Sequence, residues 1–263
     1  MVKRDIMSTI QEIWHKRSVI YNFSISDLKI RYRNSILGFF WTFLEPLLML
    51  SVLYIVFTNL FKSQIENFPL YILLGIILWN MFSRGTSTGL GSILSRGSML
   101  TQIYFPREIP AISATITSFL MLCFELIVFG IFMVVFRFVP PITIIFLPFV
   151  LLIEFILVLG ISLPLSVLNI RYRDVQFIWT VILQVGFFLT PIFYKSDILP
   201  QKFQKILYFS PMVQIVNMAH DVVLSGIFPT SESIGITVGI TLVVFVIGYS
   251  IFRRMQVRIM EEL

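Results

Sequence analysis

Charged residues are scarce in this sequence of 263 residues. Only 13% of the residues are charged, whereas 57% are apolar and the mean hydropathy is +0.90. A soluble protein of this length needs a polar surface that such a composition cannot supply. The sequence therefore predicts an integral membrane protein.

The motifs of common catalytic and metal sites are also missing. The chain has a single cysteine, Cys123, which excludes a disulfide framework, and only two histidines, His15 and His220. Neither a G-x-x-x-x-G-K-[ST] phosphate-binding loop nor an H-E-x-x-H motif occurs. We therefore expect no catalytic residue, metal site or cofactor in this chain, and no nucleic-acid partner. Any ATP and magnesium that drive its action would bind to a separate ATPase.

Six apolar stretches are long enough to cross a bilayer, which takes about 20 residues. Backbone groups inside a membrane must be hydrogen-bonded within the protein, so these stretches should be helices. The predicted fold class is all-α, a single transmembrane domain over 1–263, with spans at 36–61, 69–91, 109–136, 142–169, 175–194 and 233–252.

The distribution of basic residues predicts the orientation of the chain. With the N-terminus in the cytoplasm, fifteen of the twenty Lys and Arg residues fall on the inner side, Arg84 among them, and five fall outside. Cytoplasmic loops accumulate positive charge. We therefore expect a multi-pass protein with both termini in the cytoplasm. Because no cleavable signal peptide precedes it, the first span should act as its own targeting signal.

The N-terminal lead, 1–35, differs from an ordinary tail. Ser24 and Asp27 resemble a helix-start signal, and apolar residues then recur at helical spacing between Lys29, Arg31 and Arg33. A basic helix with one apolar stripe is typical of the membrane interface. Alternatively, its charges serve only to anchor the first span.

The external segment 195–232 is unusual because it is rich in apolar residues yet interrupted by Pro200, Pro211 and Pro229. An exposed loop would not carry so much apolar surface. The pattern predicts short re-entrant helices that dip back into the outer leaflet.

Two acidic residues, Glu125 and Glu154, interrupt apolar spans. A carboxylate at the membrane centre costs about 2.5–3.5 kcal/mol, so each should face protein or water. They either relay protons or contact a substrate, or they join two helices by hydrogen bonds.

Aromatic residues make up 15% of the chain. Phe43, Tyr54 and Phe57 share a face of the first span, and Phe177 and Phe188 share a face of the fifth. Aromatic faces suit sugars, but the same stripes are common where helices pack or face lipid. The stripes alone do not choose between these roles.

The segment 27–46 carries a more specific pattern, DLKIRYRNSILGFFWTFLEP. It resembles the opening signature of the ATP-binding-cassette type-2 permeases that export polysaccharide. The stretches 104–108, 169–174, 190–194 and 217–218 resemble later motifs of that family, in the same order over nearly the whole chain.

The resemblance implies a homodimer in the cytoplasmic (inner) membrane, paired with two copies of an ABC ATPase. The substrate would be a lipid-linked glycan, either of the O-antigen type or a teichoic acid.

The resemblance further implies three groups of site residues. The cytoplasmic entrance, which would hold the lipid head group, comprises Arg31, Tyr32, Arg33, Leu37, Gly38 and Trp41. The channel aromatics are Phe43, Tyr54, Phe57, Phe177, Phe188 and Tyr194. The coupling segment, 92–108, would contact the ATPase through Ser95, Arg96, Met99 and Leu100.

Other functions remain open at this point. A type-2 permease for a drug or lipid would have the same fold. A proton-coupled secondary transporter would use Glu125 and Glu154 and would need no ATP. A scaffold or assembly factor is a third alternative.

Overall fold

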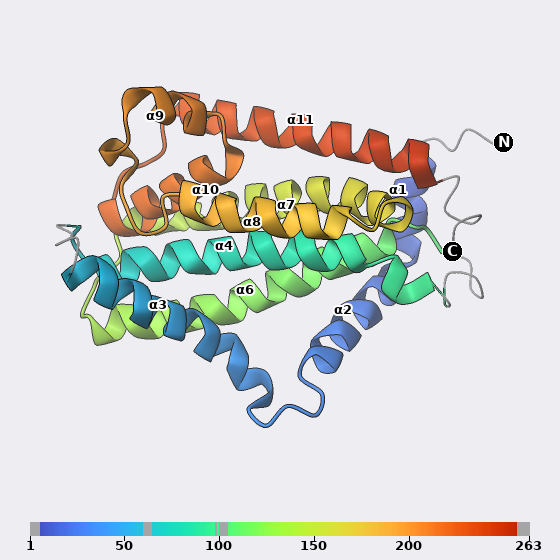
Figure 1. Ribbon diagram of the computed structural model, residues 1–263, viewed down its shortest axis with the longest axis horizontal. Coiled ribbons are helices and arrows are strands. Elements are labelled where there is room, and N and C mark those ends of the chain that lie inside the picture. Colours follow the sequence, from blue (N-terminus) through green and yellow to red (C-terminus); the bar gives the residue numbers. More distant parts are fainter. Residues whose placement is uncertain (1–5, 60–64, 98, 100–104, 257–263) are drawn as a thin grey trace.

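The computed structural model describes residues 6–59, 65–97, 99 and 105–256. Every regular element within these ranges is a helix (Figure 1). Five helices are long and apolar enough to cross a membrane, and they lie where five of the six predicted spans were expected. They are α3 (Trp41–Asn59, preceded by η1, Gly38–Phe40), α4 (Phe68–Gly91), α6 (Ile109–Val135), α7 (Leu147–Arg171, preceded by η3, Ile142–Phe146) and α11 (Ser231–Met255).

The sixth predicted span, 175–194, corresponds to the shorter apolar helix α8 (Val175–Leu189). Its 15 residues rise about 22 Å, which is less than the roughly 30 Å of a typical hydrocarbon core. Thr190 leaves the helical conformation with ψ 137°, immediately before Pro191. The count of six spans therefore stays a prediction.

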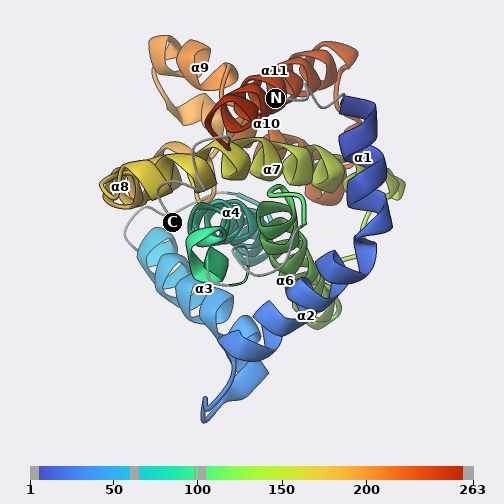
Figure 2. The same cartoon turned by 90° about the vertical axis from the view of Figure 1, so that its right-hand side faces the viewer.

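Helix α4 is the centre of the bundle. Seen along the bundle, it is surrounded by α3, α6, α7 and α8 (Figure 2), and most of its side chains are buried. Small residues let α7 come close to it. A Cβ atom added to Gly89 would lie 2.5 Å from the side chain of Ser162, so larger residues would push these two helices apart.

Helix α11 packs against α7 through two glycines. A Cβ atom added to Gly160 would lie 2.8 Å from the Cα atom of Phe245, and one added to Gly248 would overlap the carbonyl oxygen of Gly160. Small residues at helix interfaces permit this close approach in membranes.

The N-terminal lead forms α1 (Ile6–His15) and α2 (Arg17–Arg31). The prediction that a helix starts at Ser24 is wrong, because Ser24 lies in the middle of α2 and is buried. Its hydroxyl donates to the carbonyl of Ile20 (2.9 Å) instead of capping a helix, and its own carbonyl accepts from Thr117 of α6 (3.3 Å). The expected apolar face is thus partly used to pack α2 on α6.

The segment 195–232 contains η4 (Ser196–Ile198), α9 (Gln201–Tyr208), α10 (Pro211–His220) and η5 (Asp221–Ser225). These elements lie at the end of the bundle opposite α1 and the C-terminal end of α11 (Figure 1). α10 is buried, and the ring of His220 stacks on that of Tyr71 at 3.6 Å. The predicted short helices are present, and their depth in a membrane stays a prediction.

Candidate functional site

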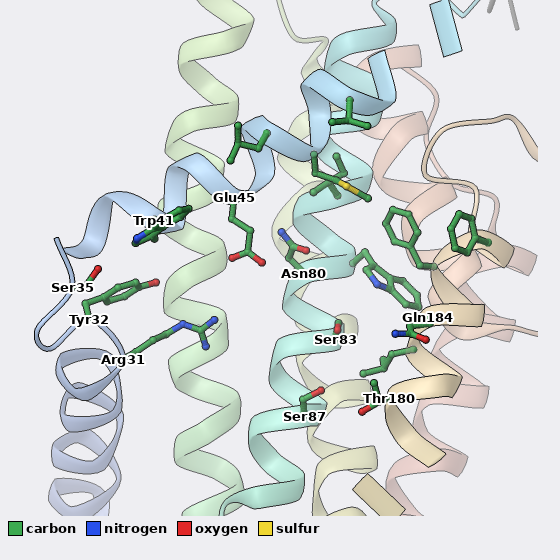
Figure 3. A pocket seen from close by; sticks show the side chains of 18 residues that line it. Arg31, Tyr32, Ser35, Trp41, Glu45, Asn80, Ser83, Ser87, Thr180 and Gln184 are labelled. Atoms are coloured by element: carbon green, nitrogen blue, oxygen red, sulfur yellow. The ribbon is translucent and has the colours of Figure 1, made fainter. Parts of the chain in front are cut away.

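A cavity of about 1170 Å³ lies between α3, α4 and α8, with the loop after α2 at one end (Figure 3). Its lining combines polar and aromatic side chains with a few aliphatic ones. The lining residues are Arg31, Tyr32, Ser35, Trp41, Glu45, Leu48, Met49, Val52, Ile76, Trp79, Asn80, Ser83, Ser87, Thr180, Leu183, Gln184, Phe187 and Phe188.

A tight turn builds the end of the cavity next to α2. The helix ends at Arg31, and Asn34 adopts a left-handed conformation (φ 60°) that reverses the chain toward α3. Asn tolerates this conformation better than most residues. The hydroxyl of Tyr32 then bonds Thr42 at 2.6 Å across the turn. This contact brings Trp41 to the same end of the cavity as Arg31.

Among the described residues, Arg31 and Glu45 are the only charged ones that line the cavity. Figure 3 shows both side chains pointing into it, one from α2 and the other from α3. A guanidinium offers five donors and suits phosphate groups. This end of the cavity can therefore bind an anion, and the nearby carboxylate limits the net positive charge there.

The opposite wall is polar but uncharged. Asn80, Ser83 and Ser87 lie on one face of α4, and Thr180 and Gln184 lie one turn apart on the facing helix α8 (Figure 3). The sequence analysis did not single out the three residues of α4. Their spacing of three and four residues within an apolar span was the signal that could have revealed them.

The predicted entrance residues divide into two groups. Arg31, Tyr32 and Trp41 line the cavity, whereas Arg33, Leu37 and Gly38 do not. Arg33 is exposed, and Leu37 is 42% exposed.

Of the six predicted channel aromatics, Phe188 alone lines the cavity in a single chain. The others lie elsewhere: Phe43 packs on Phe39, Tyr54 on Phe68 and Phe57 on Phe193, Tyr194 bonds the end of α8, and Phe177 is 71% exposed. Trp79 and Phe187 line the cavity instead and were not predicted. Neither belongs to the aromatic stripes that the sequence analysis described.

The coupling segment begins with η2 (Leu94–Arg96). Arg96 points inward, since both of its hydrogen bonds reach the carboxylate of Asp27 on α2. Ser95 and Met99 are exposed, as is Leu94, while Leu100 lies outside the described residues. A smaller cavity of about 330 Å³ lies between α2 and this segment.

Neither of the two intramembrane acids lines the large cavity. Glu125 of α6 accepts a hydrogen bond from Arg84 of α4 at 2.5 Å, and both side chains are buried. Arg84 was counted with the cytoplasmic loop charges, and that assignment is wrong, although the charge bias keeps its sign without it. Glu154 of α7 is fully buried, and neither of its carboxyl oxygens bonds a described residue.

Nothing in the described part of the chain gathers three or more potential metal ligands among His, Cys, Asp and Glu. The structural picture is thus a helical membrane bundle with a large cavity on one side. A sequence model described as ABC-2 type transporter matches residues 23–224. The chain belongs to the ABC-2 type transporter family.

Curated relatives of this ABC-2 type transporter match over almost its full length. It is 27% identical to the O-antigen export system permease protein RfbA of Klebsiella pneumoniae over 238 residues, which cover 90% of this chain and 92% of the relative. It is 26% identical to a protein of the same name from Myxococcus xanthus over 256 residues, with 97% and 98% coverage. The polysialic acid transport protein KpsM of Escherichia coli is 22% identical over 236 residues, with 87% and 90% coverage.

Proposed function

We propose that this chain is the permease subunit of an ATP-driven exporter that moves a lipid-linked polysaccharide across the cytoplasmic membrane. Its relatives are named for the export of O-antigen and for the transport of polysialic acid. The cavity between α3, α4 and α8 carries the proposal, because it places one arginine beside a polar and aromatic wall. Such a lining suits a phosphate-bearing lipid with attached sugars, of the O-antigen or teichoic acid type.

The cavity is open along one side, and that side is flanked by apolar surface. Exposed residues of α3 and α8 include Leu48, Val52, Val181 and Phe188. In the proposed complex a second copy of the chain would cover this side and complete a channel. Weak, repeated contacts along such a channel would let a polymer move without a tight binding site.

ATP hydrolysis would take place on two copies of a separate ATPase, which would also bind the magnesium. In this arrangement all six spans are used, α8 included, with both termini in the cytoplasm and the coupling segment facing the ATPase. The elements α9 and α10 would re-enter the outer leaflet and gate the exit. Without Arg84, fourteen basic residues fall on the inner side and five on the outer side, which supports this orientation.

The alternative of a proton-coupled transporter has weaker support. Such a mechanism needs Glu125 and Glu154 to exchange protons with the transport path, but neither residue lines the cavity. Glu125 is instead paired with Arg84. No specific observation favours a drug or lipid as cargo over a glycan.

Depletion of the protein in its own host tests the proposal. We expect surface polysaccharide to fall and the lipid-linked glycan to accumulate inside the cell. Purification of the tagged protein from native membranes should also recover an ABC ATPase. Normal surface polysaccharide together with increased drug sensitivity would contradict the glycan assignment, and transport by the isolated chain without ATP would contradict the ATP-driven mechanism.

A further inference from the structure

The polar wall of the large cavity contains hydrogen-bonding groups that the rest of the described chain does not use. Asn80 and Gln184 line the cavity, and neither amide forms a hydrogen bond with any other described residue. The indole N–H of Trp79 is likewise uncommitted among the described residues. By contrast, the indole of Trp179 donates to the hydroxyl of Thr86 at 3.0 Å.

Two of these groups, Trp79 and Asn80, lie in the middle of a helix that is long and apolar enough to cross a membrane. Asn80 is close to the centre of α4 (Phe68–Gly91). Unsatisfied amides at this depth are costly, because hydrocarbon cannot replace the missing hydrogen bonds. A polar occupant of the cavity, either water or a ligand, would satisfy these groups.

The charge of the wall restricts what that occupant can be. Apart from Arg31 and Glu45 at the α2 end, every lining residue is neutral. An amide offers both donors and an acceptor, whereas an indole offers only a donor. This combination matches neutral hydroxyl groups, each of which also donates and accepts, better than it matches an anion.

Trp79 is held in place by its surroundings. Its ring lies 5.4 Å from that of Phe82 and 6.0 Å from that of Phe187. On the α8 side, a Cβ atom added to Gly186 would lie 2.8 Å from the indole ring. The glycine thus makes room for the indole against α8.

We infer that Asn80, Gln184 and Trp79 form a subsite for a sugar unit of the lipid-linked glycan, while Arg31 binds the adjacent phosphate. This inference rests on the proposed function and adds the class of group that each end of the cavity recognises. A volume of about 1170 Å³ exceeds the ~300–1,000 Å³ of ordinary small-molecule pockets, so both groups fit together.

Two lipid probes that differ only in the sugar test the subsite. The full-length permease, in complex with its ATPase and in nanodiscs, is titrated with undecaprenyl diphosphate and with undecaprenyl diphosphate-linked N-acetylglucosamine. The variants are Asn80→Leu and Gln184→Met, which keep the side-chain size and favour membrane insertion. Gln176→Met is the matched control, because it makes the same change on α8 at an exposed residue outside the cavity.

We expect the wild type to bind the sugar-bearing lipid more tightly than undecaprenyl diphosphate. Each cavity variant should weaken binding of the sugar-bearing lipid by about tenfold, the effect of one or two lost hydrogen bonds, without changing binding of undecaprenyl diphosphate. The control should bind both lipids as the wild type does.

Two results would overturn the subsite. One is an unchanged preference for the sugar-bearing lipid in both cavity variants, which would mean that the amides bind only water. The other is an equal loss of affinity for both probes. The proposed function fails separately, if the wild type binds neither lipid and its depletion leaves surface polysaccharide unchanged.

Discussion

Arg96 holds Asp27 through two hydrogen bonds of 2.6 and 2.7 Å from one guanidinium nitrogen, and the same guanidinium lies 4.5 Å above the ring of Phe23. These contacts fasten the coupling segment to α2. Arg31 follows Asp27 by one helical turn and lines both cavities. A movement of the coupling segment can therefore reach the Arg31 end of the large cavity through α2.

The Arg96–Asp27 pair should serve coupling more than stability. The pair is partly exposed, so Asp27→Ala or Arg96→Ala should lower the free energy of unfolding by about 1 kcal/mol or less. We expect export to fall at least about fivefold, the lower range of typical coupling between sites, while ATP hydrolysis continues. Export and ATPase activity are measured on the same purified complex.

The exchanged double variant, Asp27→Arg with Arg96→Asp, controls for the loss of charge. It should recover part of the export, since the pair is restored but the contact of Arg96 with Phe23 is not. Export that stays normal in both single variants would show that the pair does not transmit movement.

Arg31 and Arg33 should differ in importance, because only Arg31 lines the cavity. Charge-assisted hydrogen bonds contribute about 1.5–3 kcal/mol, so Arg31→Ala should weaken binding of undecaprenyl diphosphate about 10- to 100-fold. Arg33→Ala should have a much smaller effect. Binding to nanodisc-embedded protein is the measurement, and equal losses in the two variants would place the phosphate outside the cavity.

The exposed apolar residues of the coupling segment should bind the ATPase. Leu94 is 46% exposed and Met99 is 42% exposed. Replacing both by Asp should abolish co-purification of the ATPase, because a charge would be buried in an apolar contact. Ile36→Asp is a suitable control, since Ile36 is fully exposed but lies in the loop after α2. Recovery of an intact complex from the double variant would refute this docking surface.

Glu125 and Glu154 should affect stability in different ways. Glu125→Leu leaves Arg84 buried without its partner, and breaking a buried pair in this way costs about 3–5 kcal/mol. Glu154→Leu removes a carboxyl group that bonds no described residue, so it should be neutral or stabilising. Thermal inactivation of the detergent-solubilised protein compares the two. If Glu→Gln at both positions abolished transport while stability stayed normal, a proton relay would be supported instead.

The contact between α7 and α11 should depend on Gly248. Gly248→Val introduces atoms where the carbonyl of Gly160 lies, whereas Gly239, on the same helix, has open space around it. We expect overpacking at residue 248 to cost about 1–3 kcal/mol and Gly239→Val to cost much less. Unfolding in denaturing detergent distinguishes the variants, and equal stability would mean that the helices separate without penalty.

Hydropathy predicted five membrane helices to within a few residues because length and apolarity alone determine which segments can cross a bilayer. The distribution of loop charges misplaced Arg84, which was counted with the cytoplasmic residues. Its partner Glu125 is 41 residues away in the chain, so nothing in the local sequence shows that this arginine lies inside the bundle.

The site was predicted only in part for a similar reason. Arg31, Tyr32 and Trp41 belong to a continuous motif, and the structure brings them to one end of the cavity. The facing wall joins Asn80 of α4 to Gln184 of α8. Helices α6 and α7 lie between them in the sequence, so their proximity depends on how α4 and α8 pack. Ser24 misled the prediction because a serine that bonds the preceding turn and a serine that caps a helix look alike in sequence.

The length of α8 has a consequence for the lipids around the protein. If this helix of 15 residues crosses the bilayer, it is about 8 Å shorter than a typical hydrocarbon core. Neighbouring lipids must then compress, at a cost of a fraction of a kcal/mol per Å. Bilayers with short acyl chains would relieve this compression, which makes the fatty-acid composition of the host membrane a determinant of how easily the transporter assembles.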